Sequence, residues 1–145
     1  MSAMVDRIRM IQHGEAPPPA VASLIGFTIG SVEPGRVVME MVAGPRHANP
    51  MGTVHGGILC DLADAAMGMS YASTLDEGET FTTLELKINF LKPVWTGRLT
   101  ATGRVVKGGH TVGLVECDVH DDKERLVARA SSTCMTLRGE RAEGR

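Results

Sequence analysis

The distribution of apolar and polar positions predicts one long helix and six strands. From residue 58 to residue 72 nearly every position is apolar or small, which is typical of a helix that neighbouring elements bury on most sides. This segment is too short, and too often interrupted by polar residues, to span a bilayer. Six further segments have the apolar runs or the alternation of strands, at residues 27–32, 36–42, 80–91, 99–106, 110–119 and 126–137.

The segment 80–91 alternates most regularly. One face is predicted to carry apolar side chains, namely Leu84, Leu86, Ile88 and Phe90. The other face is predicted to carry polar side chains, namely Thr83, Glu85, Lys87 and Asn89. The last four strands follow one another with only short connections, and short connections join antiparallel strands. The sequence therefore predicts an α+β fold in which one curved antiparallel sheet wraps around the helix.

The two ends of the chain are expected to differ from this central unit. Residues 1–18 are predicted to be a partly helical N-terminal segment, because a weak apolar stripe is followed by Pro17, Pro18 and Pro19, which end a helix. Residues 19–138 are predicted to form the main domain, starting with a short helical turn at 19–24. Residues 139–145 are charged and small, and are expected to be a flexible tail.

Composition narrows the classes of function. The chain has 145 residues and a net charge of −2, which fits one domain and gives no electrostatic reason to expect a nucleic acid or a membrane surface as partner. The first residues lack an apolar signal region, and the three cysteines form no CxxC pair. We therefore expect a cytoplasmic protein with reduced thiols. The five histidines lie far apart, so no metal site and no cofactor is predicted.

The most informative stretch runs from Ala48 to Gly57 and leads into the long helix. Its Asn, Pro and Gly residues indicate a loop that opens a helix, and the first amides of a helix have no partner within it. The Gly57 N–H could therefore hold a carbonyl oxygen that becomes negative during acyl transfer. Asp64 lies on the order of 13 Å further along the helix. If Asp64 is catalytic, a second, antiparallel copy of the helix must bring it to that oxygen, which favours a two-fold dimer with shared sites.

Three motifs together resemble those of a known family. They are Asn49-x-x-Gly52-x-x-His55-Gly56-Gly57, Leu62-x-Asp64, and Thr83 at the head of the strand Leu84 to Pro93. In spacing they are similar to the hotdog-fold thioesterases, and most of all to the PaaI-like subgroup named after phenylacetic acid degradation. The resemblance covers residues 20 to 138. It implies a six-stranded sheet around one helix, a homodimer that often assembles further into a homotetramer, and hydrolysis of acyl-CoA thioesters at the dimer interface.

The resemblance also implies roles for individual residues. The Gly57 amide would hold the thioester oxygen, with Asn49 and His55 beside it, and Asp64 of the opposite protomer would be the nucleophile or the general base. Thr83 would position the attacking water. The residues next to these positions are expected to contact the substrate, namely Met51, Gly56, Asp61 and Thr82. Asp61 lies one turn from Asp64 and is the alternative candidate for the catalytic acid.

Two other functions fit the same fold. A non-catalytic acyl-CoA sensor would keep the glycine loop and lose the carboxylate, so Asp64 argues against it. A hydratase of acyl thioesters would space its His and acid differently. The sequence leaves open which acyl group is taken, whether CoA or a carrier protein bears it, and whether dimers or tetramers form.

Overall fold

A computed structural model describes residues 3–145 of the chain. Its elements follow the order α1 (Ala3–Gln12), α2 (Ala20–Ile25), β1 (Phe27–Glu33), β2 (Arg36–Ala43), α3 (Gly56–Ala72), β3 (Thr80–Phe90), β4 (Gly97–Gly108), β5 (Val112–His120) and β6 (Leu126–Leu137). Short 3₁₀ turns occur at Pro45–His47 and Gly139–Ala142. Each predicted strand and the predicted long helix are confirmed, with boundaries within two residues.

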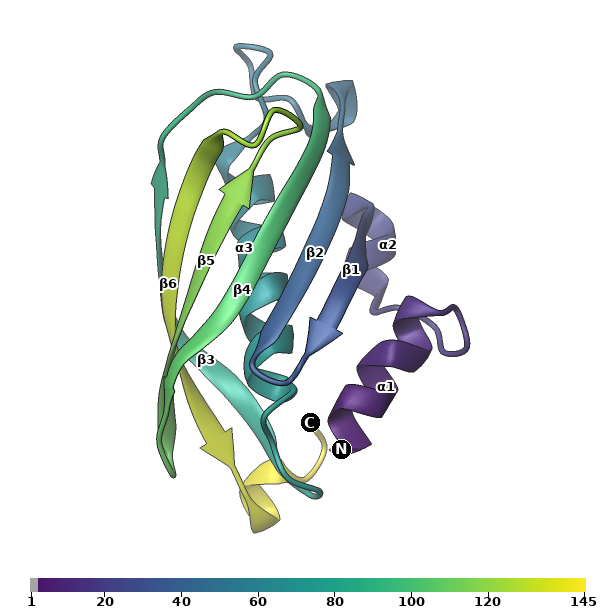
Figure 1. The fold of residues 1–145 in the computed structure, drawn as a ribbon, viewed down its shortest axis with the longest axis vertical. Helices are drawn as coiled ribbons and strands as arrows, with labels where there is room; N and C mark the ends of the chain where they lie inside the picture. The colour runs from purple at the N-terminus through teal and green to yellow at the C-terminus, as the bar shows by residue number, and fades with distance from the viewer. Residues whose placement is uncertain (1–2) are drawn as a thin grey trace.

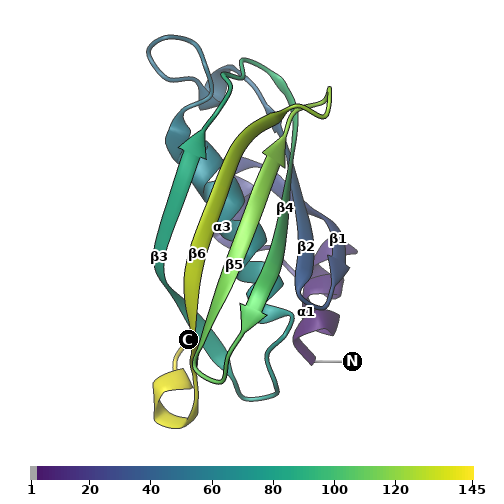
Figure 2. The ribbon, with the colours of Figure 1, turned by 60° about the vertical axis from the view of Figure 1, so that its left-hand side comes forward.

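The six strands form one antiparallel sheet in the order β1-β2-β4-β5-β6-β3. Figure 1 shows the sheet curving around α3, with α1 and α2 beyond the β1 edge. Figure 2 shows β3 at the opposite edge. The far edge of β3 has no strand partner within residues 3–145.

Small residues let α3 lie close to the middle of the sheet. A Cβ atom at Gly103 of β4 would lie 2.4 Å from the Ala66 carbonyl oxygen, so only glycine fits at this contact. The buried Ser70 hydroxyl accepts the Val37 N–H at 3.0 Å and donates to the Ala66 carbonyl at 2.7 Å. These contacts fix the position of α3 along the sheet.

The helix is buried on most sides, as its sequence predicted. Leu59, Leu62, Ala66 and Met67 are buried against the sheet, on the core side of α3. A stripe along the other side, comprising Gly57, Asp61 and Asp64, is exposed in the single chain. The two aspartates therefore lie on the face of α3 that the chain itself leaves uncovered.

A β-bulge corrects the predicted alternation of β3. The pairing with β6 shifts between Thr83 and Glu85, so Thr83 lies opposite the buried Cys134 while Glu85 lies opposite Thr133. The extra residue Leu84 is 53% exposed. A bulge reverses which side chains face inwards on either side of it. Thr83 therefore faces α3, and the prediction that placed Leu84 on the same face as Leu86 was wrong.

The terminal segments also have defined structure. Val5 and Ile8 of α1 are fully buried, and α1 packs on β1 and α3. Gly139–Ala142 forms a 3₁₀ turn with no buried residue, and the predicted flexibility of the tail stays a prediction. No helix among residues 3–145 is long and apolar enough to cross a membrane.

Candidate functional site

The loop before α3 is held by a buried histidine. His47 is 4% exposed; its Nδ1 accepts the Gly44 N–H at 3.1 Å, and its Nε2 lies 2.8 Å from the Ile25 carbonyl oxygen. The backbone carbonyl of His47 accepts the His55 N–H at 2.8 Å. His47 thus connects the end of α2 with His55, the residue that caps the start of α3.

Asn49 organises the tip of this loop. Its Oδ1 accepts the Met51 N–H at 2.9 Å and the Thr53 N–H at 3.2 Å, and its Nδ2 donates to the Thr53 hydroxyl at 2.8 Å. One Nδ2 hydrogen is left to face a ligand. The side chain of Met51 is 82% exposed and lines no pocket in the single chain.

His55 caps α3 and accepts the backbone N–H of Gly57, one of the two glycines that begin the helix. Its Nδ1 accepts the Gly57 N–H at 3.0 Å, which places the proton of a neutral imidazole on Nε2. The Gly57 amide, predicted to hold the thioester oxygen, is therefore already bonded within the chain. The Gly56 N–H donates no hydrogen bond within the described part of the chain. Of the two amides, Gly56 is the one that is free to bind a ligand oxygen.

A pocket of about 430 Å³ opens beside Gly56. We call it the helix-start pocket; it includes Asn49, Thr53, Gly56, Leu59 and the segment from Phe90 to Val94. A Cβ atom at Gly56 would lie 2.9 Å from the Phe90 ring. The motifs in the sequence did not predict Phe90 and Lys92 as lining residues. They reach the helix-start pocket because β3 ends close to the start of α3.

Asp64 lies at a different place, towards β3 and β6. Its charge raises the pKa of the Cys134 thiol, although burial of that thiol is the larger cause. The Cys134 sulfur lies 3.9 Å from the Thr83 hydroxyl. The fold therefore brings the predicted residues Asp64 and Thr83 to the same side of α3. Thr82 lies opposite Met135 in the sheet, so it lies on the outer face, away from α3.

The environment of Asp64 disfavours its charged form. Partial burial of the carboxyl group and, to a smaller extent, the charge of Asp61 raise the pKa of Asp64 above its ordinary value. Asp61 is exposed on the same stripe. A carboxylate whose pKa is raised is a better proton acceptor in its ionised form, which suits a general base.

Gly56 and Asp64 are too far apart to act on one carbonyl group within one chain. They are separated by eight positions of a continuous helix, which corresponds to about 12 Å along its axis. The chain therefore presents two partial sites, one at the start of α3 and one at Asp64.

Comparison with known proteins identifies the family. The sequence profile of the thioesterase superfamily matches residues 51–128, which include the end of the loop before α3, Asp64 and Thr83. The chain belongs to the thioesterase superfamily. Its sheet around one long helix is the hotdog fold, as the resemblance predicted.

Three relatives illustrate the match. A solved phenylacetic acid degradation-related protein from Ralstonia eutropha is 35% identical, covers 88% of this chain and 98% of its own, and superposes with a TM-score of 0.81. The 1,4-dihydroxy-2-naphthoyl-CoA hydrolase of Listeria monocytogenes is 29% identical over 75% of this chain and 89% of its own length. Human acyl-coenzyme A thioesterase 13 is 26% identical over 92% of this chain and 96% of its own. The thioesterase is thus related to two enzymes named for CoA thioesters over 75% and 92% of its length.

Proposed function

We propose that the chain hydrolyses acyl-CoA or aryl-CoA thioesters to the free acid and CoA, at sites shared between two copies. The observation that carries this proposal is the separation of about 12 Å between the free Gly56 N–H and Asp64 on one rigid helix. A second copy with its α3 antiparallel to the first brings the partner's Asp64 to the start of α3.

The surface of the single chain supports pairing of two copies. The open edge of β3 offers unpaired backbone groups to a second β3 strand. Large apolar side chains lie exposed on β3 and the loop after it, namely Leu84, Phe90, Leu91 and Trp95. Pairing along this edge makes the two sheets continuous and covers the stripe that carries Asp64. Assembly of two such dimers into a tetramer stays a prediction.

In the reaction the thioester oxygen lies at the first amides of α3. The Gly56 N–H donates to it as the charge develops, and the positive end of the helix dipole stabilises that charge. Gly57 stays a predicted second donor, which is available once His55 Nδ1 releases its N–H. His55 Nε2–H and the free Nδ2 hydrogen of Asn49 are additional donors at this place.

Asp64 of the partner supplies the electrons for cleavage. Its carboxylate attacks the carbonyl carbon or removes a proton from a water that does so, and in both cases it must be ionised. Thr83 lies on the same side of α3 as its own protomer's Asp64 and positions the water. When water attacks, the carbon–sulfur bond breaks and the CoA thiolate takes up the proton that Asp64 removed. When the carboxylate itself attacks, CoA leaves first and a water then hydrolyses the mixed anhydride with Asp64, which releases the free acid.

The test measures release of free thiol from a panel of acyl-CoA and aryl-CoA thioesters. Wild-type protein should release thiol, and Asp64→Asn should lower the rate at least about a hundredfold while binding is retained. Equal rates for the two proteins would exclude Asp64 from the mechanism. Binding without any release by wild-type protein would instead indicate a sensor of acyl-CoA.

Sharing of the site has its own test. A Gly56→Val chain blocks the helix start against Phe90, and an Asp64→Asn chain lacks the carboxylate. Refolded together in equal amounts, the two inactive chains should recover about a quarter of wild-type activity, because half of the dimers are hybrids with one intact site. A site built within one chain would give no recovery.

A further inference from the structure

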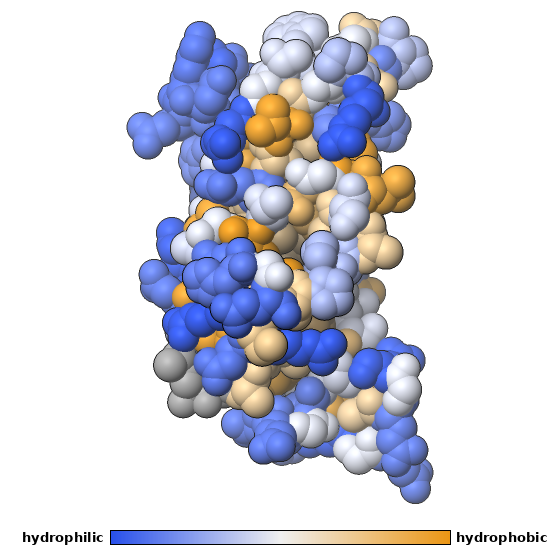
Figure 3. Space-filling model, turned by 90° about the vertical axis from the view of Figure 1, so that its right-hand side faces the viewer, coloured by the Kyte–Doolittle hydropathy of each residue, from blue (hydrophilic) through white to orange (hydrophobic). Residues whose placement is uncertain are grey.

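A second and larger cavity lies on the other side of α3. It has a volume of about 630 Å³ and is enclosed by the segment from Ile11 to Ser23, by β1 and by α3. Figure 3 shows the face of the molecule that carries α1 and α2, where hydrophobic residues come to the surface between hydrophilic ones. None of the predicted catalytic or substrate-binding residues lines this cavity.

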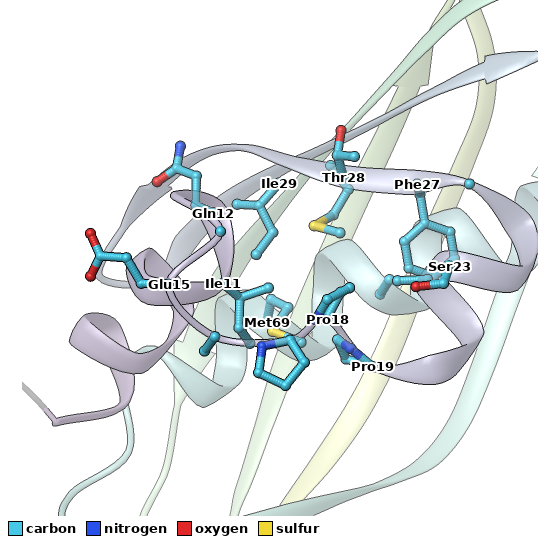
Figure 4. Close-up of a pocket in the computed structure, with 17 residues that line it drawn as sticks. Ile11, Gln12, Glu15, Pro18, Pro19, Ser23, Phe27, Thr28, Ile29 and Met69 are labelled. Atoms are coloured by element: carbon cyan, nitrogen blue, oxygen red, sulfur yellow. The ribbon is translucent and has the colours of Figure 1, made fainter.

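The floor of the cavity is apolar. In Figure 4 the side chains of Ile11, Ile29, Phe27 and Met69 converge on the same space, with Pro18 and Pro19 closing it from below. Ile29 and Met69 are half-buried, and Met39 behind them is buried. Unbranched methionine side chains adjust to a flexible apolar ligand.

Polar groups stand only at the rim. Gln12 donates its side-chain N–H to the Gly30 carbonyl at 2.8 Å, and Glu15, Ser23 and Thr28 are exposed. Figure 4 shows the carboxylate of Glu15 turned away from Met69. The cavity thus offers no buried donor or charge to a polar substituent, and the carboxylate at its rim repels a ligand that ends in a carboxylate.

The outer wall is rigid before any ligand arrives. Pro17, Pro18 and Pro19 fix the backbone between α1 and α2, and α1 is anchored by the buried residues Val5 and Ile8. A preformed wall lowers the entropic cost of binding, because less chain has to be ordered.

A small residue of α3 connects this cavity with Asp64. Ala65 lines the cavity and follows Asp64 directly, and Met69 lies one turn further along α3. The space over Gly68 is taken by the Phe81 ring, which would lie 3.2 Å from an added Cβ atom. An acyl group whose carbonyl lies at Asp64 therefore reaches the cavity past the short side chain of Ala65.

We propose that this cavity, which we call the proline-walled cavity, binds the acyl part of the substrate and selects uncharged aliphatic chains; this rests on the proposed thioesterase activity. A cavity of about 150 Å³ already holds a benzene ring, so a single aromatic ring would leave most of these 630 Å³ unfilled. A medium-length aliphatic chain fills more of the space and lies against its apolar floor.

The first experiment measures kcat/KM for straight-chain acyl-CoA thioesters of increasing length and for benzoyl-CoA and phenylacetyl-CoA. For wild-type protein we expect a rise of about fourfold per methylene until the cavity is full, since each buried methylene adds a constant transfer free energy. A flat series, or a preference for the two aromatic substrates, would overturn the proposal.

A matched pair of variants tests the place of binding. Ser23→Trp puts a ring into the cavity from its exposed rim, whereas Leu24→Trp adds the same ring at the next position, which is 77% exposed and outside the cavity. Ser23→Trp should reduce kcat/KM at least about tenfold for ten-carbon chains, mainly through KM, and leave acetyl-CoA within twofold. Leu24→Trp should match wild type for both. Equal losses for the short and long chains in Ser23→Trp, with an unchanged thermal unfolding curve, would overturn the proposal.

A binding measurement separates this inference from the proposed activity. Calorimetry with thioether analogues of acyl-CoA, which cannot be hydrolysed, should show affinity that rises with chain length in wild type and not in Ser23→Trp. That result supports the cavity even if no thioester is cleaved. If thioesters are cleaved but both proteins bind all analogues equally, the cavity is not the acyl site although the activity stands.

Discussion

At the scale of single residues, the candidate site residues lie at two places on one helix. Asp61 and Asp64 lie together on the exposed stripe in the middle of α3, and the charge of Asp61 contributes to the raised pKa of Asp64. His55 and Gly56 lie at the start of the same helix. Each place gives a prediction of its own.

Replacing Asp61 should shift the pH dependence of the enzyme. Asp61→Asn removes a negative charge that disfavours ionisation of Asp64, so the pKa of Asp64 falls towards its ordinary value. Because Asp64 must be ionised to act, the acidic limb of the kcat/KM profile should move to lower pH. Glu77→Gln changes the net charge equally on an exposed loop and should leave the profile in place. A shift to higher pH in Asp61→Asn would contradict this assignment.

Replacing His55 separates its structural role from its role at the site. His55→Ala removes the cap on the Gly57 N–H and should lower the free energy of unfolding by about 1 kcal/mol, measured by urea denaturation. His55→Asn can cap the helix again and should recover most of this loss. If the Nε2–H contacts the substrate, activity stays low in both variants. Full activity in His55→Asn would limit His55 to capping.

At the scale of elements, most of the fold followed from the sequence. Alternation and the apolar run between residues 58 and 72 were sufficient to predict all six strands and the central helix, because these patterns reflect which side chains face the core. The bulge at Leu84 was not predictable, since an extra residue in one strand is defined only against its partner β6. This bulge decides that Thr83 faces α3.

The contact between α3 and β4 gives a prediction about stability. Gly103→Ala would place a methyl group 2.4 Å from the Ala66 carbonyl oxygen, so the helix must move or the strand must bend. We expect a loss of about 1–3 kcal/mol in the free energy of unfolding. Gly44→Ala, where an added Cβ meets nothing within 4 Å and the backbone is extended, is the control and should change it little. Similar losses in both would show that packing at Gly103 is not tight.

At the scale of the whole molecule, the candidate site was only half predictable. Motif spacing predicted residues at the start and in the middle of α3, and the distance along the helix predicted that one chain cannot join them. The proline-walled cavity depends on how the N-terminal segment packs against β1 and α3. No local pattern carries that information.

Pairing along β3 should be necessary for activity. Leu84→Glu places a charge on the exposed bulge of the free edge and should prevent formation of the proposed dimer, with loss of most hydrolysis. Leu114→Glu on β5 is the matched control, since Leu114 is 41% exposed within the sheet and away from its edge. Light scattering after size-exclusion chromatography checks both. An active Leu84→Glu monomer would disprove the shared site.

The open edge of β3 has a consequence for the protein during its synthesis. A newly folded chain presents eleven residues of strand edge to any other extended polypeptide until a partner arrives. Such edges recruit partly unfolded chains into aggregates. Substitutions that weaken pairing should therefore appear in cells as insoluble material before they can be observed as an inactive soluble enzyme.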